Sequence, residues 1–549
     1  MLLLTFFLSI PPESLIEHQH KAAVYGQKMM VVTANQHATE AAFAILKEGG
    51  SAIDAAIAAQ MVLGLVEPQS SGLGGGALLL YYDKKKDKVI AYDGRERAPG
   101  EISDTLFSEE RFIIGGKAVG VPGLLAMLEL AHHEHGNLPW SKLFESSIAL
   151  AIGGFDISPR LKGLIEVTPY LDTFDETKSY LFGKSRLTNP KLAATYRTIA
   201  REGSSPFYQG EIGKQIVLAV QNASFNPGTL SMKDLALYKP IVRRPLSTTY
   251  RGYTIFGFPP PSSGGIAVMQ IMQMLRNKNL KKESLASLSF ITLFCNASYL
   301  AFADRNYYIG DPDFFSVPVH RLLDRSYLKK RSKLFDGKEG IKRIARGTYP
   351  SQNVEPALHY SIAEELPCTS QISIIDQAGN AVSMSTSVEN AFGSTLMAAG
   401  FFLNNQLTDF SPSAGIGGVK AANGIEPYKR PMSAMAPTFV FNNEGLFLNI
   451  GSAGGPWIID YVAQALLGIL DFGMNIQEAI SFPHYGAIQK TIDLEAHTFL
   501  DKYIQPLKER GFEVREFPMP SGTQGIEISG DGFIGGTDPR REGTVASNS

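Results

Sequence analysis

The sequence predicts an α+β fold, in which helices and antiparallel hairpins occupy separate stretches of the chain. Residues 369–387 alternate between apolar and small polar side chains on either side of a turn at 376–380, which is the pattern of a β-hairpin. Residues 438–450 repeat this pattern around Asn442-Asn443-Glu444-Gly445. Helical spacing of apolar residues is concentrated in the N-terminal half.

The composition is that of a globular protein with a large core. Hydrophobic residues make up 44% of the 549 residues and charged residues 19%, which excludes a disordered chain. A chain of this length has about three or four domains on average, although large single domains exist. Because 51 Lys and Arg residues nearly balance 53 Asp and Glu residues, the charge does not favour nucleic acid or an anionic membrane as a partner.

The N-terminal segment leaves two interpretations open. Residues 1–10 form an apolar run of the secretory type, but the run is short and no Lys or Arg precedes it. Residues 1–20 are therefore either a signal-like segment or a hydrophobic, disordered tail. Elsewhere no apolar run is long enough to span a bilayer, and the stretch 53–66 is interpreted as a buried helix.

The N-terminal half opens with a predicted helix pair, 38–46 and 52–66, separated by Gly49-Gly50. A glycine loop at 71–76 then leads into a predicted strand at 77–82. A phosphate-binding loop would carry a lysine and open a helix, and this loop does neither. We therefore interpret its glycines as sites of close backbone packing. The remaining predicted elements are helices at 121–133, 140–152, 266–275 and 457–470, a strand at 400–403, a mobile or surface loop at 411–424 and a hairpin at 525–536.

Histidine and cysteine give no pattern of metal ligands. His132, His133 and His135 are interpreted as the surface of a helix that ends near Gly136, rather than as a metal site. The two cysteines exclude a disulfide framework and a cysteine-based zinc site. One disulfide between them is possible, but the sequence does not support it.

A cluster of hydroxyls begins the first hairpin, directly after Pro367 and Cys368. A threonine hydroxyl is a weak nucleophile and needs an adjacent base. If the chain were cut between Cys368 and Thr369, the new α-amino group would supply that base on the same residue. A hydroxyl-rich surface hairpin without chemistry is the alternative that these local residues leave open.

Several blocks in fixed order, from about Met30 to the C-terminus, resemble the γ-glutamyltransferase (γ-glutamyltranspeptidase) family of self-processing N-terminal-nucleophile hydrolases. The blocks are Arg95-Glu96-x-Ala98-Pro99, Thr369-Ser370-x-x-Ser373, Asn404-Asn405-Gln406-x-x-Asp409, Lys429-Arg430-Pro431-Met432-Ser433 and Gly451-Ser452-x-Gly454-Gly455. The resemblance implies a four-layer αββα sandwich. It also implies cleavage between Cys368 and Thr369 into a helix-rich large subunit, 21–368, and a small subunit, 369–549. The two subunits form a heterodimer and together make one intertwined domain.

The resemblance assigns the site as follows. Thr369 is the nucleophile and base, Ser387 assists, and the backbone N–H groups of Gly454 and Gly455 form the oxyanion hole. Substrate is held at both charges of its α-amino acid group. Arg95 and Ser433 bind the α-carboxylate, and the α-ammonium is bound by Glu389, Gln406 and Asp409. No cofactor and no metal are implied.

The implied activity is cleavage of the γ-glutamyl amide of glutathione and related compounds, with transfer to an amino acid, a dipeptide or water. The alternatives are a related acylase, a poly-γ-glutamate depolymerase, or an unprocessed inactive homologue that acts as a binding protein. The family and the apolar N-terminus favour a periplasmic or secreted protein, and a cytoplasmic one is not excluded. Three departures bear on specificity: Gln371 replaces the usual His, Ala434 replaces the second serine of a pair, and the 410–429 loop is short.

Overall fold

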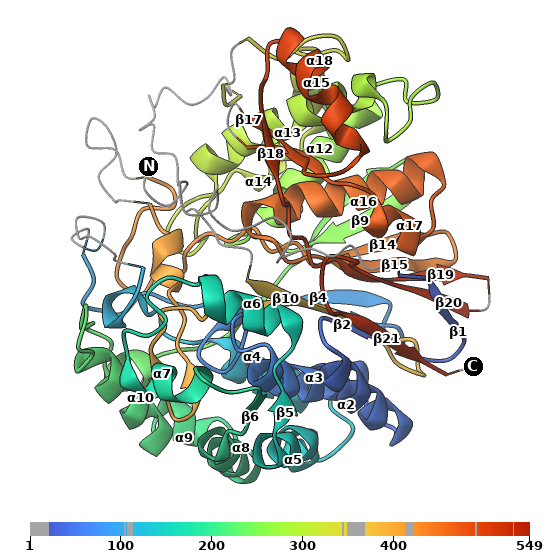
Figure 1. The fold of residues 1–549 in the computed structure, drawn as a ribbon. Helices are drawn as coiled ribbons and strands as arrows, with labels where there is room; N and C mark the ends of the chain where they lie inside the picture. The colour runs from blue at the N-terminus through green and yellow to red at the C-terminus, as the bar shows by residue number, and fades with distance from the viewer. Residues whose placement is uncertain are drawn as a thin grey trace.

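Two antiparallel sheets lie face to face between two layers of helices (Figure 1). The predicted αββα sandwich is thus confirmed. The computed structural model describes residues 21–103, 106, 113–342, 345–347, 368–411, 421–488, 491–530 and 532–548. The expectations for residues 1–20, and for most of the loop at 411–424, concern positions outside these ranges.

The lower sheet in Figure 1 carries the predicted nucleophile. Its order is β21-β2-β10-β11-β3-β4-β7, with all neighbours antiparallel. Its strands are β2 (Met30–Thr33), β3 (Gly76–Asp83), β4 (Lys88–Gly94), β7 (Ile241–Arg243), β10 (Thr369–Ile375), β11 (Ala381–Ser387) and β21 (Thr544–Ser547). Strands from before and after residue 369 are therefore hydrogen-bonded neighbours within one sheet, at β21–β2, β2–β10 and β11–β3.

The upper sheet has the order β1-β20-β19-β15-β14-β9-β8 and is also antiparallel throughout. Its strands are β1 (Val24–Gly26), β8 (Leu246–Tyr250), β9 (Tyr253–Gly257), β14 (Thr438–Asn442), β15 (Gly445–Gly451), β19 (Gln524–Ser529) and β20 (Gly532–Thr537). Three smaller sheets are formed by β5 (Phe155–Asp156) with β6 (Arg186–Leu187), by β12 (Met397–Ala398) with β13 (Phe401–Phe402), and by β16 (Tyr485–Ile488), β17 (Thr491–Glu495) and β18 (Glu513–Phe517).

The hairpin of β10 and β11 places Thr369 at one end of the lower sheet. Thr369 pairs with Ser387, which pairs on its other side with Gly76 of β3. At the far end the Asp376 N–H donates to the Asn380 carbonyl at 3.0 Å and closes the turn. This hairpin and the one formed by β14 and β15 are both confirmed.

Polar side chains of this hairpin face the upper sheet and are buried there. Ser373 Oγ donates to the Gln524 carbonyl at 3.1 Å, and Ser383 Oγ donates to the Ile450 carbonyl at 3.2 Å. The alternating pattern correctly marked a face of small polar residues, but this face does not meet solvent. Its hydroxyls satisfy backbone carbonyls of the second sheet, so the sheets are joined by hydrogen bonds as well as by apolar contacts.

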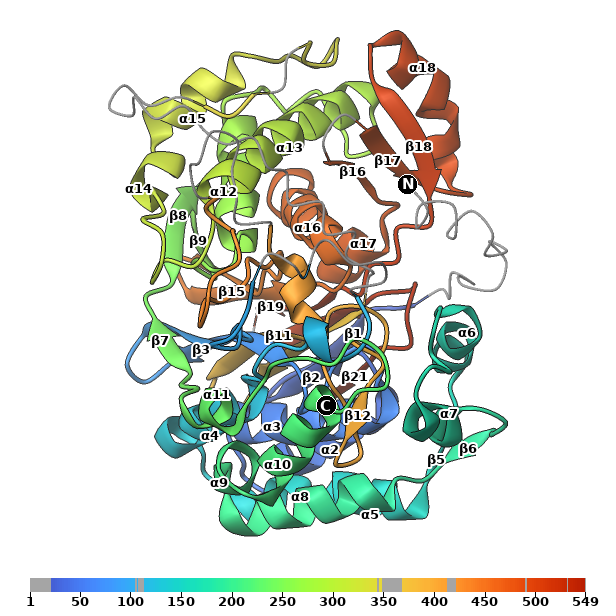
Figure 2. The same cartoon turned by 90° about the vertical axis from the view of Figure 1, so that its left-hand side faces the viewer.

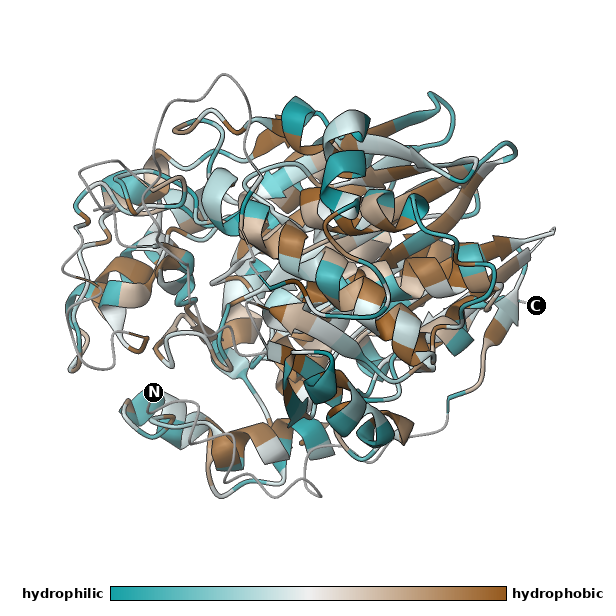
Figure 3. Cartoon of the chain, turned by 90° about the horizontal axis from the view of Figure 1, so that it is seen from above, coloured by the Kyte–Doolittle hydropathy of each residue, from teal (hydrophilic) through white to brown (hydrophobic). Residues whose placement is uncertain are grey.

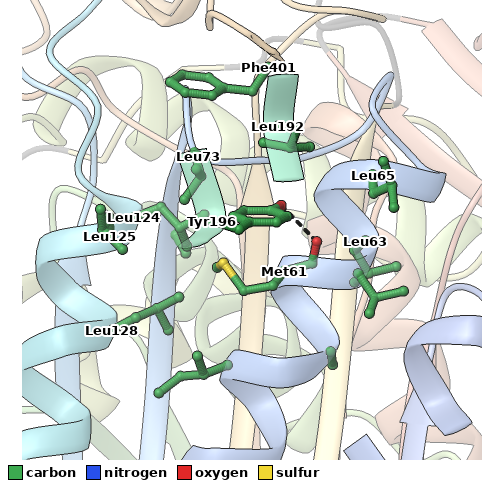
Figure 4. Packing of buried hydrophobic residues seen from close by; sticks show 14 of the residues in the cluster. Met61, Leu63, Leu65, Leu73, Leu124, Leu125, Leu128, Leu192, Tyr196 and Phe401 are labelled. Carbon is green, nitrogen blue, oxygen red and sulfur yellow. Dashed lines mark hydrogen bonds between the residues drawn. The ribbon is translucent and has the colours of Figure 1, made fainter. Parts of the chain in front are cut away.

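The lower helix layer is built around α3 (Ala52–Val66), in which every residue is buried. Ser51 caps this helix by accepting from the Asp54 N–H at 3.2 Å, while the Asp54 carboxylate accepts from the Ser51 N–H at 2.9 Å. The flanking helices are α2 (Gln36–Lys47), α4 (Leu124–His135) and α8 (Pro190–Glu202). Tyr196 of α8 donates its hydroxyl to the Met61 carbonyl at 2.7 Å, within a cluster of leucines (Figure 4).

The upper helix layer consists mainly of α12 (Gly264–Arg276), α13 (Leu288–Tyr308) and α16 (Ile458–Phe472), which cover the upper sheet (Figure 2). Their buried residues join the apolar side chains between the two sheets in one cluster. Hydrophobic stretches accordingly gather in the interior and hydrophilic ones towards the outer loops (Figure 3). In the described part of the chain, no helix combines the length and apolar character that crossing a membrane requires.

Most predicted elements are present with shifted ends. The predicted helix at 140–152 is a 3₁₀ turn, η4 (Trp140–Phe144), followed by α5 (Glu145–Gly153). The glycine loop packs closely, as predicted: a Cβ on Gly74 would lie 2.0 Å from the Phe402 carbonyl oxygen. The remaining helices are η3 (Gly116–Ala118), α6 (Pro159–Val167), α7 (Asp175–Leu181), α9 (Ser205–Tyr208), α10 (Glu211–Gln221), α11 (Met232–Ala236), α14 (Val319–Leu322), α15 (Arg325–Ser332), η5 (Gln406–Asp409), η7 (Gly455–Trp457), α17 (Ile476–Ser481), η8 (Phe499–Tyr503) and α18 (Ile504–Glu509).

The prediction that three histidines of α4 form a helix surface is only partly correct. His133 is exposed, but His135 Nε2 lies 2.7 Å from the Tyr92 hydroxyl, and its ring packs on Tyr81 with centroids 4.2 Å apart. His135 thus anchors α4 to the lower sheet. Among the described residues, no group of three or more His, Cys, Asp or Glu side chains is placed to hold a metal ion. Both cysteines, Cys295 and Cys368, are buried free thiols.

Candidate active site

Thr369 begins β10 between the two sheets. Its side chain shares a face of the strand with Gln371, which packs against Gly451 of the upper sheet. Thr369 is 5% exposed, and its Oγ1 donates to the Ser387 Oγ at 3.3 Å. The predicted nucleophile and the hydroxyl predicted to assist it are therefore in contact.

Ser387 links Thr369 to a cluster of polar side chains. Its Oγ accepts from the Glu389 N–H at 2.9 Å. Gln406 Nε2 then donates to Glu389 Oε2 at 3.2 Å and to Asp409 Oδ2 at 2.7 Å. Glu389 holds a φ of 83°, which few residues other than glycine adopt and which is common at functional sites. All three predicted acceptors for an α-ammonium thus form one buried cluster.

Arg95 lies against this cluster, fully buried. Its Nη2 pairs with the Asp409 carboxylate and also donates to the Met432 carbonyl at 2.8 Å, while its Nε donates to the Pro431 carbonyl at 3.2 Å. Burial by itself would lower the pKa of Arg95, but the neighbouring carboxylates, Asp409 first, raise it. Arg95, which is predicted to bind the α-carboxylate, and Asp409, which is predicted to bind the α-ammonium, therefore neutralise each other in the structure.

Ser433 follows directly after this contact and is held rigidly. Its N–H donates to the Pro261 carbonyl at 3.1 Å, and its carbonyl accepts from Ser263 Oγ at 2.7 Å. Its hydroxyl accepts from the Met435 N–H at 3.1 Å. Ser433 thus follows directly after the Pro431 and Met432 carbonyls that accept from Arg95, and its binding of an α-carboxylate stays a prediction.

Glu96 is a buried acid that the sequence analysis did not assign. Its Oε2 lies 3.4 Å from Arg95 Nη1, and its Oε1 has no hydrogen-bond partner. Burial raises the pKa of Glu96 to about 8, against the opposing effect of Arg95. The carboxyl is therefore largely protonated at neutral pH. In the sequence, only its position next to Arg95 indicates that Glu96 belongs to the site.

Gly454 is the N-cap of η7 and Gly455 is its first residue, and η7 continues into α16, so the N–H groups of both glycines lie at a helix N-terminus. Their φ angles of 133° and 60° favour glycine. A Cβ on Gly454 would lie 2.5 Å from the ring of Tyr461, which is itself fully buried. Gly454 is thus required by both conformation and space, and Gly455 by conformation, which suits backbone N–H groups that approach a reacting oxygen.

Known proteins resemble the chain over most of its length. The gamma-glutamyltranspeptidase family profile matches residues 38–548. The chain is 32% identical to the glutathione hydrolase proenzyme of Escherichia coli (strain K12), over 96% of this chain and 93% of that protein. It is 35% identical to the glutathione hydrolase proenzyme of Bacillus subtilis (strain 168), over 86% of this chain and 82% of that protein.

The chain belongs to the gamma-glutamyltranspeptidase family. Among solved structures, the cephalosporin acylase from Bacillus halodurans superposes with a TM-score of 0.83 at 26% identity, covering 96% of this chain and 97% of that one. The fold is therefore that of the N-terminal-nucleophile hydrolases, and the protein is an enzyme of the gamma-glutamyltranspeptidase family.

Gln371, which replaces the usual histidine of the gamma-glutamyltranspeptidases, is buried between the sheets. Its Nε2 donates to Ser383 Oγ at 3.0 Å, and its Oε1 accepts from Ser385 Oγ at 2.6 Å. A Cβ on Gly451 would lie 2.4 Å from its amide carbon. Gln371 therefore links β10 to β11 by hydrogen bonds and packs against β15 of the upper sheet. Replacing histidine by glutamine thus changes the side chain that supports β10. Ala434, the second departure, is buried in the apolar cluster of the upper layer, so Ser433 carries the one hydroxyl of this pair.

We expect Gln371→Ala to lower the stability of this gamma-glutamyltranspeptidase by about 2–4 kcal/mol, because it opens a cavity and leaves the Ser385 hydroxyl without its acceptor. The KM for a γ-glutamyl substrate should change by less than about twofold. Thermal unfolding and steady-state kinetics measure the two effects, and Gln505→Ala on the exposed face of α18 serves as the control. A tenfold higher KM would instead place Gln371 in the substrate site.

We expect Gly454→Ala to lower kcat about 100- to 1,000-fold, because the Cβ would displace the N–H groups that are predicted to form the oxyanion hole. Gly445→Ala is a matched control: Gly445 has a similar φ of 126°, but a Cβ there would meet nothing within 4 Å. Both variants strain the backbone, and only the first should lose kcat in an assay with a γ-glutamyl anilide. Equal losses in both variants would contradict the oxyanion assignment.

Proposed function

We propose that the enzyme cleaves the γ-glutamyl amide bond of glutathione and related compounds through a γ-glutamyl ester on Thr369. The observation that carries this proposal is the hydrogen-bonded series from Thr369 through Ser387, Glu389 and Gln406 to the Arg95–Asp409 pair. A free α-amino acid group carries one charge of each sign. A buried cation next to a buried anion is complementary to it.

The same site accounts for the reaction. Thr369 Oγ1 attacks the γ-carbonyl carbon, and the proton of the hydroxyl passes to the free α-amine of Thr369. The N–H groups of Gly454 and Gly455 stabilise the oxyanion that forms. When the C–N bond breaks, the leaving amine takes the proton from the α-ammonium. Water, or the amine of an amino acid or dipeptide, then attacks the ester and releases Thr369.

The proposal requires cleavage of the chain between Cys368 and Thr369, because an amide nitrogen is not a base. Cleavage yields a large subunit, 21–368, and a small subunit, 369–549. Their strands are hydrogen-bonded neighbours at three junctions of the lower sheet, which supports a heterodimer that stays assembled after cleavage. We also propose an exported enzyme, periplasmic or secreted, as the family resemblance implies.

Two measurements test the proposal. A denaturing gel with N-terminal sequencing should show two fragments, the smaller of which begins at Thr369. The purified protein should release the anilide from a γ-glutamyl anilide, and a dipeptide acceptor should change the rate if transfer competes with hydrolysis. A single intact band without turnover would identify an unprocessed binding protein instead.

An acylase is the second candidate, because a cephalosporin acylase covers nearly the whole chain. A glutaryl anilide lacks the α-amino group and cannot use the Glu389–Gln406–Asp409 cluster. If the proposed function is correct, the glutaryl compound should react at least about 100-fold more slowly in kcat/KM, since its binding leaves buried charges without a partner. Equal or faster turnover of the glutaryl compound would identify an acylase.

A further inference from the structure

Arg541 connects the C-terminal segment to the nucleophile. Its guanidinium is buried, with the whole residue 4% exposed. Nη1 donates to the Thr369 carbonyl at 2.7 Å, and Nη2 donates to the Pro520 carbonyl at 3.1 Å. One side chain therefore joins the first residue of β10 to the segment that precedes β19.

The segment held by Arg541 also supports the glycines of the oxyanion site. Gly522 and Ala453 exchange two backbone hydrogen bonds, at 3.2 and 3.3 Å, and Ala453 directly precedes Gly454. A Cβ on Gly522 would lie 2.9 Å from the Arg541 Cζ, so the guanidinium packs directly against this backbone. Arg541 thus contacts Thr369 directly, and it contacts the glycine pair indirectly through Gly522 and Ala453, so it links the two parts of the site whose spacing an acyl transfer requires.

Thr369 and its strand neighbour Ser370 lie among buried groups of both charges. Ser370, on the opposite face of β10, donates to the Glu67 carboxylate at 3.0 Å, and Glu67 pairs with Arg160 of α6 at 3.1 Å. Burial, followed by the charge of Arg160, lowers the pKa of Arg541 to about 10, so it stays charged at neutral pH. The titratable groups near this junction are Glu67, Arg160, Cys368, Glu389, Asp538, Arg541 and Glu542, with Lys21 behind them.

We propose that Arg541 is a positioning residue for Thr369. It fixes the carbonyl of the nucleophile against the 520–522 segment, which is hydrogen-bonded to Ala453 next to Gly454, and its charge disfavours protonation of the α-amine that cleavage frees. This inference rests on the proposed function, because only a cleaved Thr369 has an α-amine.

The sign of the electrostatic effect follows from geometry. The nitrogen and the carbonyl oxygen of one residue lie within about 3.6 Å of each other, so Nη1 lies within about 6 Å of the Thr369 nitrogen. A positive charge at that distance destabilises an ammonium ion and leaves a neutral amine unaffected. An unperturbed α-amino group has a pKa of about 7.7–8.0 and is mostly protonated at pH 7. Arg541 therefore increases the fraction of enzyme that holds its base in the active form.

Two variants separate the charge from the hydrogen bond. Arg541→Gln retains a donor for the Thr369 carbonyl and removes the charge, whereas Arg541→Lys retains the charge. We expect the acidic limb of the kcat/KM profile against pH to move up by about one unit in the Gln variant and by less than about 0.3 in the Lys variant. A purely structural role would lower the rate without moving this limb.

Arg510→Met is the matched control, because Arg510 also donates to backbone carbonyls, of Leu288 and Gly337, in the upper helix layer. It should leave cleavage and the pH profile unchanged. An acidic limb at the wild-type pH in both Arg541 variants overturns the proposal. If neither Arg541 variant is cleaved while both melt within a few degrees of the wild type, the positioning role is supported. A wild-type protein that is not cleaved, or does not act on γ-glutamyl anilide, overturns the proposed function instead.

Discussion

Thr369→Ala should remain a single chain and show no turnover of γ-glutamyl anilide. Self-cleavage requires attack of the Thr369 hydroxyl on the Cys368 carbonyl, which gives an ester that water then hydrolyses. The same hydroxyl later attacks the substrate, so one substitution removes both reactions. The loss of turnover should reach the detection limit, as expected for the removal of a nucleophile. Thr369→Ser keeps the hydroxyl and should still cleave and retain part of the activity.

Thr438→Ala provides the control for Thr369→Ala. Thr438 is also a buried threonine at the first position of a strand, but in the upper sheet, where its hydroxyl donates locally to the Ala436 carbonyl at 2.9 Å. This control should be cleaved and active. Gel electrophoresis, N-terminal sequencing and the anilide assay provide the measurements. An alanine variant that matures into two chains beginning at residue 369 would contradict the assignment of Thr369.

The hairpins were predictable because their signals are local. Alternation in 369–387 depends on neighbours in the sequence, and the register that pairs Thr369 with Ser387 follows from the turn at 376–380. The long helix α13 was not predicted. Its buried residues lie on all of its faces, so it lacks the one-sided spacing that identifies a surface helix.

The site was predictable only where residues match a family block, and its contacts were not. Arg95 and Asp409 are 314 positions apart in the sequence, and only the fold reveals that they pair. Arg541 was overlooked for the same reason, since its contact with Thr369 spans 172 positions. For Gln371 the family motif was misleading. Its position in the motif suggested a role in specificity, whereas the fold directs its side chain between the sheets.

The Arg95–Asp409 pair explains how a buried charged site remains stable without substrate. Each charge would be costly to bury alone, and together they offset most of that cost. A substrate with an α-carboxylate and an α-ammonium can separate the two, because it offers each a new partner and leaves the buried net charge unchanged. A substrate with only one of these groups would leave Arg95 or Asp409 without a partner, which disfavours its binding.

Asp409→Ala should therefore lower kcat/KM for γ-glutamyl anilide by about 30- to 5,000-fold, which corresponds to 2–5 kcal/mol for the loss of one partner of a buried charge pair. Cleavage before Thr369 should be largely unaffected, since Asp409 contacts Arg95 and Gln406 and is separated from Thr369 by the hydrogen bonds of Ser387.

Asp471→Ala is the matched control for Asp409→Ala. Asp471 is also a buried carboxylate that pairs with an arginine, Arg251, but it lies at the end of α16. Both variants should lose stability in thermal unfolding, and only Asp409→Ala should lose activity. Two results together would contradict the assignment of Asp409 as the partner of the α-ammonium. The Asp409 variant would keep the wild-type kcat/KM for γ-glutamyl anilide, and its preference for γ-glutamyl anilide over glutaryl anilide would be undiminished. The selectivity for an α-amino group would then have to come from Glu389.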